Sequence, residues 1–133
     1  MKKKKKKEYI FQCGCFITAY AREKTIRTSQ IIKDYSLSKY GEDYYIYSDT
    51  DSIHTKLGIE ELEKICDIDP VRLGAWKNEG YATRGKFIRQ KCYIEEIDNQ
   101  IKITCAGMPK SCYSYVEWNK FKTGFTCRRK INF

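Results

Sequence analysis

Two short β-prone runs on either side of a polar tip constrain the fold of this chain more than any other feature of its sequence. Residues 44–47 are rich in aromatic side chains, and residues 52–55 resume a strand-like pattern after a brief polar interruption. Runs of this kind, joined by a few polar residues, are typical of a β-hairpin. The pattern predicts antiparallel pairing, with Asp49, Thr50 and Asp51 at or near the hairpin tip.

A second hairpin and several helices follow from the rest of the pattern. Residues 86–97 have the composition of a strand, and residues 101–105 are predicted to pair with it across a three-residue polar turn. Residues 14–35 carry apolar side chains near helical spacing, which predicts a helix of about five turns with its apolar face inward. Short helices are predicted at residues 59–66 and 116–123. Helices beside antiparallel hairpins predict an α+β fold.

Charge is divided unevenly along the 133 residues, which carry a formal net charge of +9. Residues 2–7 are all lysine and are expected to form a solvated tail, with a nucleic-acid-binding arm as the alternative. Residues 8–76 hold eight basic and twelve acidic side chains, whereas residues 77–133 hold twelve basic and five acidic ones. An acidic middle followed by a basic end predicts a carboxylate site beside a surface that binds polyanions.

Composition and the lengths of the apolar runs indicate a packed protein in the cytoplasm. Hydrophobic residues make up 41% of the chain and aromatic residues 14%, more than a disordered segment contains. No run approaches the roughly 18 apolar residues of a membrane span, and none near the start suits a signal peptide. We therefore expect a soluble, intracellular protein without a membrane partner.

Several residues with reactive or aromatic side chains are expected to be structural. The seven cysteines are scattered and include no CxxC pair, so we assign them neither a metal site nor a redox role. The only histidine, His54, is expected to pack or to form a structural hydrogen bond. Trp76 and Trp118 are expected to anchor cores.

The predicted hairpin tip holds the clearest chemical signal, an aspartate pair in the sequence YSDTDS. Residues two apart in an extended chain point the same way, so Asp49 and Asp51 are predicted to face one small volume. Carboxylate oxygens suit hard cations, and Mg²⁺ is commonly held by one or two carboxylates together with substrate phosphates. The pair therefore favours phosphoryl or nucleotidyl transfer. A turn-forming role without chemistry is the alternative for a DxD sequence.

Six colinear segments extend this signal into a family resemblance. The segment YSDTDSIH resembles motif C of the family B DNA polymerases. The others resemble the protein-primed branch of phages and linear plasmids, in the same order, within about residues 9–127; they are GCFITAYARE (14–23), LGAWKNE (73–79), KFIRQKCYI (86–94), CAGM (105–108) and FKTGF (121–125). This resemblance implies an antiparallel-sheet palm subdomain with flanking helices at residues 9–105, after a lysine-rich tail at 1–8 and before a small partial thumb at 106–133.

The resemblance also implies roles for individual residues. Asp51 and Asp49 would be the catalytic, metal-binding carboxylates of a two-metal site for Mg²⁺, with Mn²⁺ as a substitute. Two further sets are implied: nucleotide-binding residues Tyr47 and Thr50, and primer- or DNA-binding residues Lys91, Tyr93, Lys122 and Arg128. On a strand Lys91 and Tyr93 would share a face, because they are two residues apart.

The implied partners are primer–template DNA, dNTPs, a terminal protein and a separate upstream polymerase polypeptide, in the host cytoplasm if a phage encodes the chain. The sequence departs from the family in lacking the motif A carboxylate strand and the motif B helix. The chain alone is therefore expected to be inactive. Two alternatives remain open at this point: a non-catalytic nucleic-acid-binding remnant, and a metal-dependent nuclease.

Overall fold

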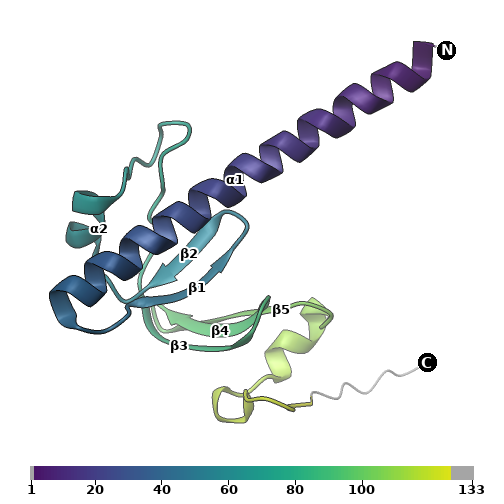
Figure 1. Ribbon diagram of the computed structural model, residues 1–133. Coiled ribbons are helices and arrows are strands. Elements are labelled where there is room, and N and C mark those ends of the chain that lie inside the picture. The colour runs from purple at the N-terminus through teal and green to yellow at the C-terminus, as the bar shows by residue number, and fades with distance from the viewer. Residues whose placement is uncertain (1, 127–133) are drawn as a thin grey trace, which may run out of the picture. The chain divides into compact units, whose positions relative to one another are not determined.

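The computed structural model describes residues 2–126, with the side chains of residues 14–126, and combines helices with antiparallel sheets (Figure 1). The α+β prediction is confirmed. The chain divides into two compact units, Met1–Asn78 and Glu79–Phe133. No helix in the part of the chain that the structure describes is long and apolar enough to cross a membrane.

The first unit is organised on one long helix, α1 (Lys2–Tyr40). The prediction of a helix over residues 14–35 was too short at both ends, and the predicted lysine tail is continuous with the helix. Lysine is a favourable helix former, so the run can extend α1 despite its repulsion. The helix ends where Gly41 adopts a φ of 71° and its N–H donates to the Leu37 carbonyl at 3.0 Å.

The face of α1 that packs inward is mostly polar, contrary to the prediction of an inward apolar face. Among the helix residues whose side chains are described, 14–40, the buried positions are Thr25, Thr28, Ile32 and Ser36. By contrast, large apolar side chains are exposed on it, namely Phe16, Ile17, Tyr20, Ile26 and Ile31. The reason is that backbone and indole groups approach the helix and need hydrogen-bond partners, which the small hydroxyl side chains supply.

The predicted first hairpin is confirmed as β1 (Tyr45–Asp49) and β2 (Ser52–Thr55), paired antiparallel. It lies along α1 in Figure 1. Ser36 of the helix is fully buried and fixes the entry to β1, because its Oγ accepts the Tyr44 N–H at 3.1 Å and donates to the Lys33 carbonyl at 3.0 Å.

The short helix α2 (Ile59–Ile65) also confirms its prediction, apart from one residue at its end. It begins after Gly58 and carries acidic residues in its first turn and Lys64 in its last, an arrangement that suits the helix dipole. Beyond its end, two backbone hydrogen bonds join the Asp67–Asp69 segment to Trp76, and they close the loop between them.

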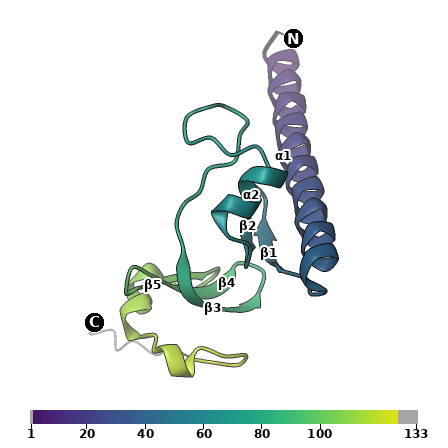
Figure 2. The same cartoon turned by 90° about the vertical axis from the view of Figure 1, so that its left-hand side faces the viewer.

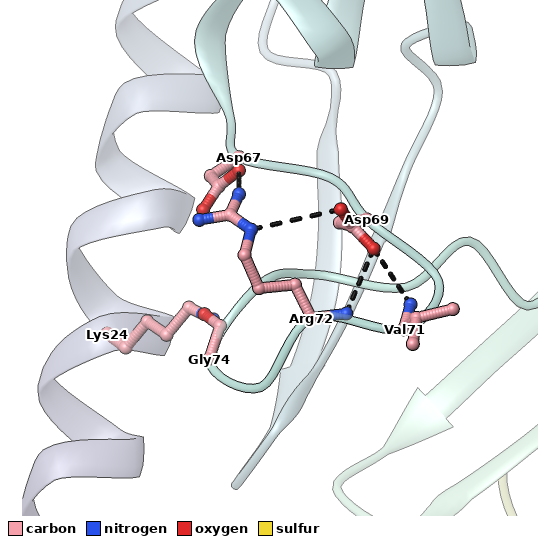
Figure 3. Close-up of polar contacts among 6 residues, drawn as sticks. All are labelled: Lys24, Asp67, Asp69, Val71, Arg72 and Gly74. Atoms are coloured by element: carbon pink, nitrogen blue, oxygen red, sulfur yellow. Dashed lines mark hydrogen bonds and ion pairs between the residues drawn. The ribbon is translucent and has the colours of Figure 1, made fainter.

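Polar contacts hold this loop in shape and join it to α1 (Figure 3). Asp69 Oδ1 accepts the backbone N–H groups of Val71 at 2.8 Å and Arg72 at 2.9 Å, and these bonds lower the pKa of the Asp69 carboxyl. The Arg72 guanidinium contacts the carboxylates of Asp67 and Asp69. Lys24 of α1 donates to the Gly74 carbonyl.

Trp76 completes the attachment of the loop to α1. Its indole Nε1–H donates to Thr28 Oγ1 at 3.1 Å, and the Lys24 ammonium lies 4.6 Å from the centre of its ring. Trp76 is half-buried and is not among the buried core residues, so it holds the loop to α1 through polar and ring contacts rather than as the predicted core anchor.

The second unit contains a three-stranded antiparallel sheet in the order β3 (Ala82–Arg89), β4 (Cys92–Ile97) and β5 (Gln100–Cys105) (Figure 2). The single strand predicted over residues 86–97 is wrong, because a turn at Gln90 and Lys91 divides it into β3 and β4. Lys91 adopts a φ of 55°, which no strand residue has.

The turn between β4 and β5 has two residues rather than the predicted three. Asp98 and Asn99 have φ values of 51° and 61°, and Gln100 already pairs with Ile97. Two successive positive φ values characterise the type I′ turn that favours a tight hairpin, and Asp and Asn tolerate this conformation better than most residues.

The single short helix predicted over residues 116–123 is also wrong, because only the three-residue 3₁₀ helix η2 (Trp118–Lys120) lies there. A second 3₁₀ helix, η1 (Lys110–Tyr115), comes just before this region. Val116 and Phe121 have extended backbone, which ends each helix. Burial explains the interruption: Phe121 enters the core of the second unit together with Cys92, Ile94 and Cys105. Trp118 packs against this core, as expected for an anchor.

Candidate functional site

The acidic pair lies at the turn of the first hairpin. Asp49 is the last residue of β1 and is half-buried, whereas Asp51 is exposed and forms the two-residue turn with Thr50. Asp49 Oδ1 accepts the Thr50 N–H at 2.9 Å and lies 3.3 Å from Thr50 Oγ1. The predicted location is confirmed, but the strand argument for a shared face does not hold, because Asp51 belongs to the turn.

A buried threonine of α1 holds this turn in place. Thr25 Oγ1 lies 2.8 Å from the Thr50 carbonyl oxygen and 2.9 Å from the Ala21 carbonyl oxygen, so its single proton is shared between the two acceptors. Thr25 is only 6% exposed. Sequence reasoning missed this residue. The available signal was the recurrence of small hydroxyl residues at positions 25, 28 and 36, with the helical spacing of one face.

The residues around the pair are held by contacts across the hairpin. Tyr47 is half-buried and its ring centre lies 5.6 Å from that of His54, its cross-strand partner. This contact confirms a packing role for His54. The Tyr45 hydroxyl and Ser48 Oγ are 2.7 Å apart, and Thr50 is exposed at the turn.

The donor set suits magnesium in kind. Carboxylate oxygens are the ligands this hard cation prefers, and Mg²⁺ is usually bound through one or two carboxylates while waters and substrate phosphates complete its shell. Among the described residues, no group of three or more His, Cys, Asp or Glu side chains is placed to hold a metal ion. Two carboxylates at one turn match in number and kind the protein ligands that Mg²⁺ uses when it is shared with substrate phosphates.

The basic candidates lie on the second unit. Lys91 is exposed in the turn between β3 and β4, and its carbonyl accepts the Ala106 N–H at 2.7 Å. Tyr93 is half-buried on β4, where its ring stacks on Phe87 with centres 5.1 Å apart and planes inclined by 23°. The shared strand face predicted for Lys91 and Tyr93 is therefore wrong, since the left-handed turn at Lys91 interrupts the alternation.

Two further DNA-binding candidates come from the end of the chain. Lys122 is exposed just after η2. Arg128 lies outside the described residues. The acidic pair belongs to the first unit, and all the described basic candidates belong to the second.

Comparison with known proteins shows which proteins this chain is similar to. No protein-family model matches the chain. The DNA polymerase of Bacillus phage phi29 is 36% identical over 136 residues, in an alignment that covers 88% of this chain and 22% of the relative. The DNA polymerase of Streptococcus phage Cp-1 is 31% identical over 120 residues, covering 86% of this chain and 19% of the relative.

Solved structures agree with the sequence comparison. The phi29 DNA polymerase complexed with primer–template DNA and incoming nucleotide matches with a TM-score of 0.66 and 32% identity, covering 84% of this chain and 21% of that one. This chain is homologous to the phi29-type protein-primed DNA polymerases. The family resemblance of the sequence motifs is thereby confirmed. The chain spans about a fifth of the length of these phage polymerases.

Proposed function

We propose that the chain forms the C-terminal part of the palm, with part of the thumb, of a DNA-directed DNA polymerase. Such an enzyme transfers a nucleotide from a dNTP to a primer 3′-hydroxyl during DNA replication. The observation that supports this most strongly is the homology with phage DNA polymerases over 88% of the chain. The aspartate pair at the β1–β2 turn supplies the chemistry that such a reaction needs.

Asp51 and Asp49 are the proposed metal-binding carboxylates. When bound there, Mg²⁺, or Mn²⁺ in its place, supplies positive charge for the triphosphate and for the primer 3′-hydroxyl. The protein's own part is positioning, because Thr25 holds the turn through the Thr50 carbonyl and β1 pairs with β2 on either side of it. Tyr47 and Thr50, which flank Asp49 on the hairpin, are proposed to contact the incoming nucleotide.

Lys91, Tyr93, Lys122 and Arg128 are proposed to hold the primer and the duplex product. An exposed lysine provides a point charge for phosphate, which suits Lys91 and Lys122. Tyr93 is different, because its ring stacks on Phe87 and a tyrosine hydroxyl can donate or accept a hydrogen bond. The solved phi29 complex with primer–template DNA and nucleotide supports DNA and dNTPs as partners.

The 133-residue chain alone is proposed to be inactive. Two carboxylates provide part of a two-metal site, and this type of catalysis depends on geometry. A second polypeptide carrying the motif A carboxylate and the motif B helix would complete it. A terminal protein is proposed as a further partner, and the host cytoplasm as the location if a phage encodes the chain.

Primer extension tests the proposal. The chain would be assayed with labelled primer–template DNA, dNTPs and Mg²⁺, with and without a polypeptide that supplies motifs A and B. Extension is expected only with both polypeptides, and Asp51→Asn should abolish it. Asp34→Asn is the matched control, because Asp34 is an exposed carboxylate of α1 whose Oδ1 accepts a hydrogen bond from Gln30 on the same helix at 2.9 Å. Extension by the chain alone that requires Asp51 would contradict the proposed dependence on a second polypeptide.

A nucleic-acid-binding remnant is the second candidate, and the excess of basic residues in 77–133 favours it. It predicts salt-sensitive DNA binding with no extension under any combination of polypeptides. Nuclease activity of the chain alone in Mn²⁺ would instead indicate the third possibility, a metal-dependent nuclease that uses Asp49 and Asp51.

A further inference from the structure

The β4–β5 pairing brings two of the scattered cysteines together inside the second unit. Cys92 and Cys105 are direct cross-strand partners whose sulfur atoms lie 3.3 Å apart. They are 2% and 8% exposed. The sequence offered no sign of this pair, because twelve residues separate the two positions and only the hairpin register makes them neighbours.

The backbone around the pair has the geometry that a cross-strand disulfide needs. The Ala106 N–H donates to the Lys91 carbonyl at 2.7 Å, which makes Lys91 and Ala106 a hydrogen-bonded pair. The Cys105 N–H points elsewhere, toward the Tyr113 hydroxyl at 3.4 Å. Because the two pair types alternate along an antiparallel ladder, Cys92 and Cys105 form a non-hydrogen-bonded pair.

The expected separations follow from that assignment. Cα atoms of a non-hydrogen-bonded pair lie about 4.5 Å apart, which is inside the range of roughly 4.4–6.8 Å found in disulfides. An S–S bond is about 2.05 Å long, so the two sulfur atoms need to approach by little more than an ångström. A rotation about the side-chain bonds supplies this movement without a change of strand register.

We propose that Cys92 and Cys105 form a disulfide when the protein meets a two-electron thiol oxidant. With diamide as the oxidant, one thiolate adds to the N=N bond to give a sulfenylhydrazine. The second thiolate then attacks the sulfur atom of that adduct, which forms the S–S bond and breaks the S–N bond. Both S–H bonds break and one S–S bond forms. The two hydrogens and two electrons pass to diamide, which leaves as the hydrazine. The inference does not depend on the polymerase function proposed above.

The environment of the pair disfavours the thiolate form of Cys105. Burial, and after it the hydrogen bond with Cys92, raises the pKa of the Cys105 thiol. The thiolate is the reactive form, so the raised pKa slows oxidation. Because both cysteines are buried, the oxidant must also be small enough to reach them. Once formed, the bond would fix β4 to β5 next to Lys91 and would restrict the unfolded chain.

Mapping of the cross-link tests the proposal on the full chain. Native protein would be oxidised with diamide, alkylated, digested without reductant and analysed by mass spectrometry. The expected product is a peptide pair joined through Cys92 and Cys105, with a loss of about 2 Da and of two titratable thiols. The melting temperature should rise on oxidation and return on reduction.

Controls separate the native pair from random cysteine chemistry. Cys66→Ser should keep the cross-link and the shift in melting temperature, whereas Cys105→Ser should lose both. Protein oxidised in urea should instead show mixed pairings among its cysteines. If native protein gives no Cys92–Cys105 peptide, or gives other pairs in equal yield, the proposal is wrong. This mapping uses the unmodified sequence, so the result stands even if a serine variant fails to fold.

Discussion

Replacing Thr25 with valine removes the hydroxyl that joins α1 to the turn carrying Asp51, while the shape of the side chain hardly changes. In the structure this hydroxyl lies 2.8 Å from the Thr50 carbonyl oxygen, and the side chain is 6% exposed. The valine would leave that carbonyl without its donor in a partly buried place. A net hydrogen bond contributes about 0.5–1.5 kcal/mol, and an unsatisfied buried group costs about 1–3 kcal/mol.

We therefore expect Thr25→Val to lower the free energy of unfolding by about 1–2 kcal/mol. Helix propensity contributes little to this difference, because threonine and valine have similar values. The assay is urea denaturation followed by circular dichroism and tryptophan fluorescence. The slope of the transition should stay unchanged, which shows that the two proteins expose the same surface on unfolding.

Thr18→Val is the matched control. The hydroxyl of Thr18 donates to the Gly14 carbonyl at 2.8 Å, and Thr18 lies in an exposed part of the same helix. Its loss should cost less than about 0.5 kcal/mol, as is usual for surface substitutions. Equal losses for the two variants would refute the reasoning, because the turn contact would then contribute nothing. In the two-polypeptide extension assay, Thr25→Val should lower the rate more than Thr18→Val at matched folded fraction.

Three further substitutions test the fold. The pKa of the Asp69 carboxyl is lowered by the backbone N–H groups of Val71 and Arg72. Its contribution to stability is therefore present above the unfolded-state pKa of about 3.9 and is lost as pH falls through the lower folded-state pKa. Asp69→Asn should flatten the acid end of the stability–pH curve, and an unchanged curve would contradict this. Ile94 is fully buried, so Ile94→Ala should cost about 2–5 kcal/mol in urea denaturation. Asn99→Val should cost about 1–2 kcal/mol, because a β-branched residue is strained at a φ of 61°; a neutral effect would argue against the type I′ turn.

The sequence predicted the position of the candidate site correctly, but it did not predict which of the site residues share a face. The YSDTDS segment predicted a hairpin with Asp49 and Asp51 at its tip, since alternation and turn residues are local signals. The prediction that both carboxylates share a strand face failed, because a two-residue turn places Asp51 outside the strand. The prediction that Lys91 and Tyr93 share a strand face failed for the same reason, because Lys91 lies in a turn. Periodicity cannot reveal a residue with left-handed backbone inside a β-prone run.

The sequence by itself determined the α+β class, the first hairpin, α2 and the family, because each depends on neighbouring residues or on colinear motifs. Tertiary structure alone decided which face of α1 is buried. Apolar spacing favoured Phe16, Ile17 and Tyr20, which are 66%, 70% and 70% exposed, whereas Thr25 and Ser36 are buried. Polar backbone groups of the hairpin meet the helix there, and a buried carbonyl or N–H group requires a partner more strictly than an apolar side chain requires burial.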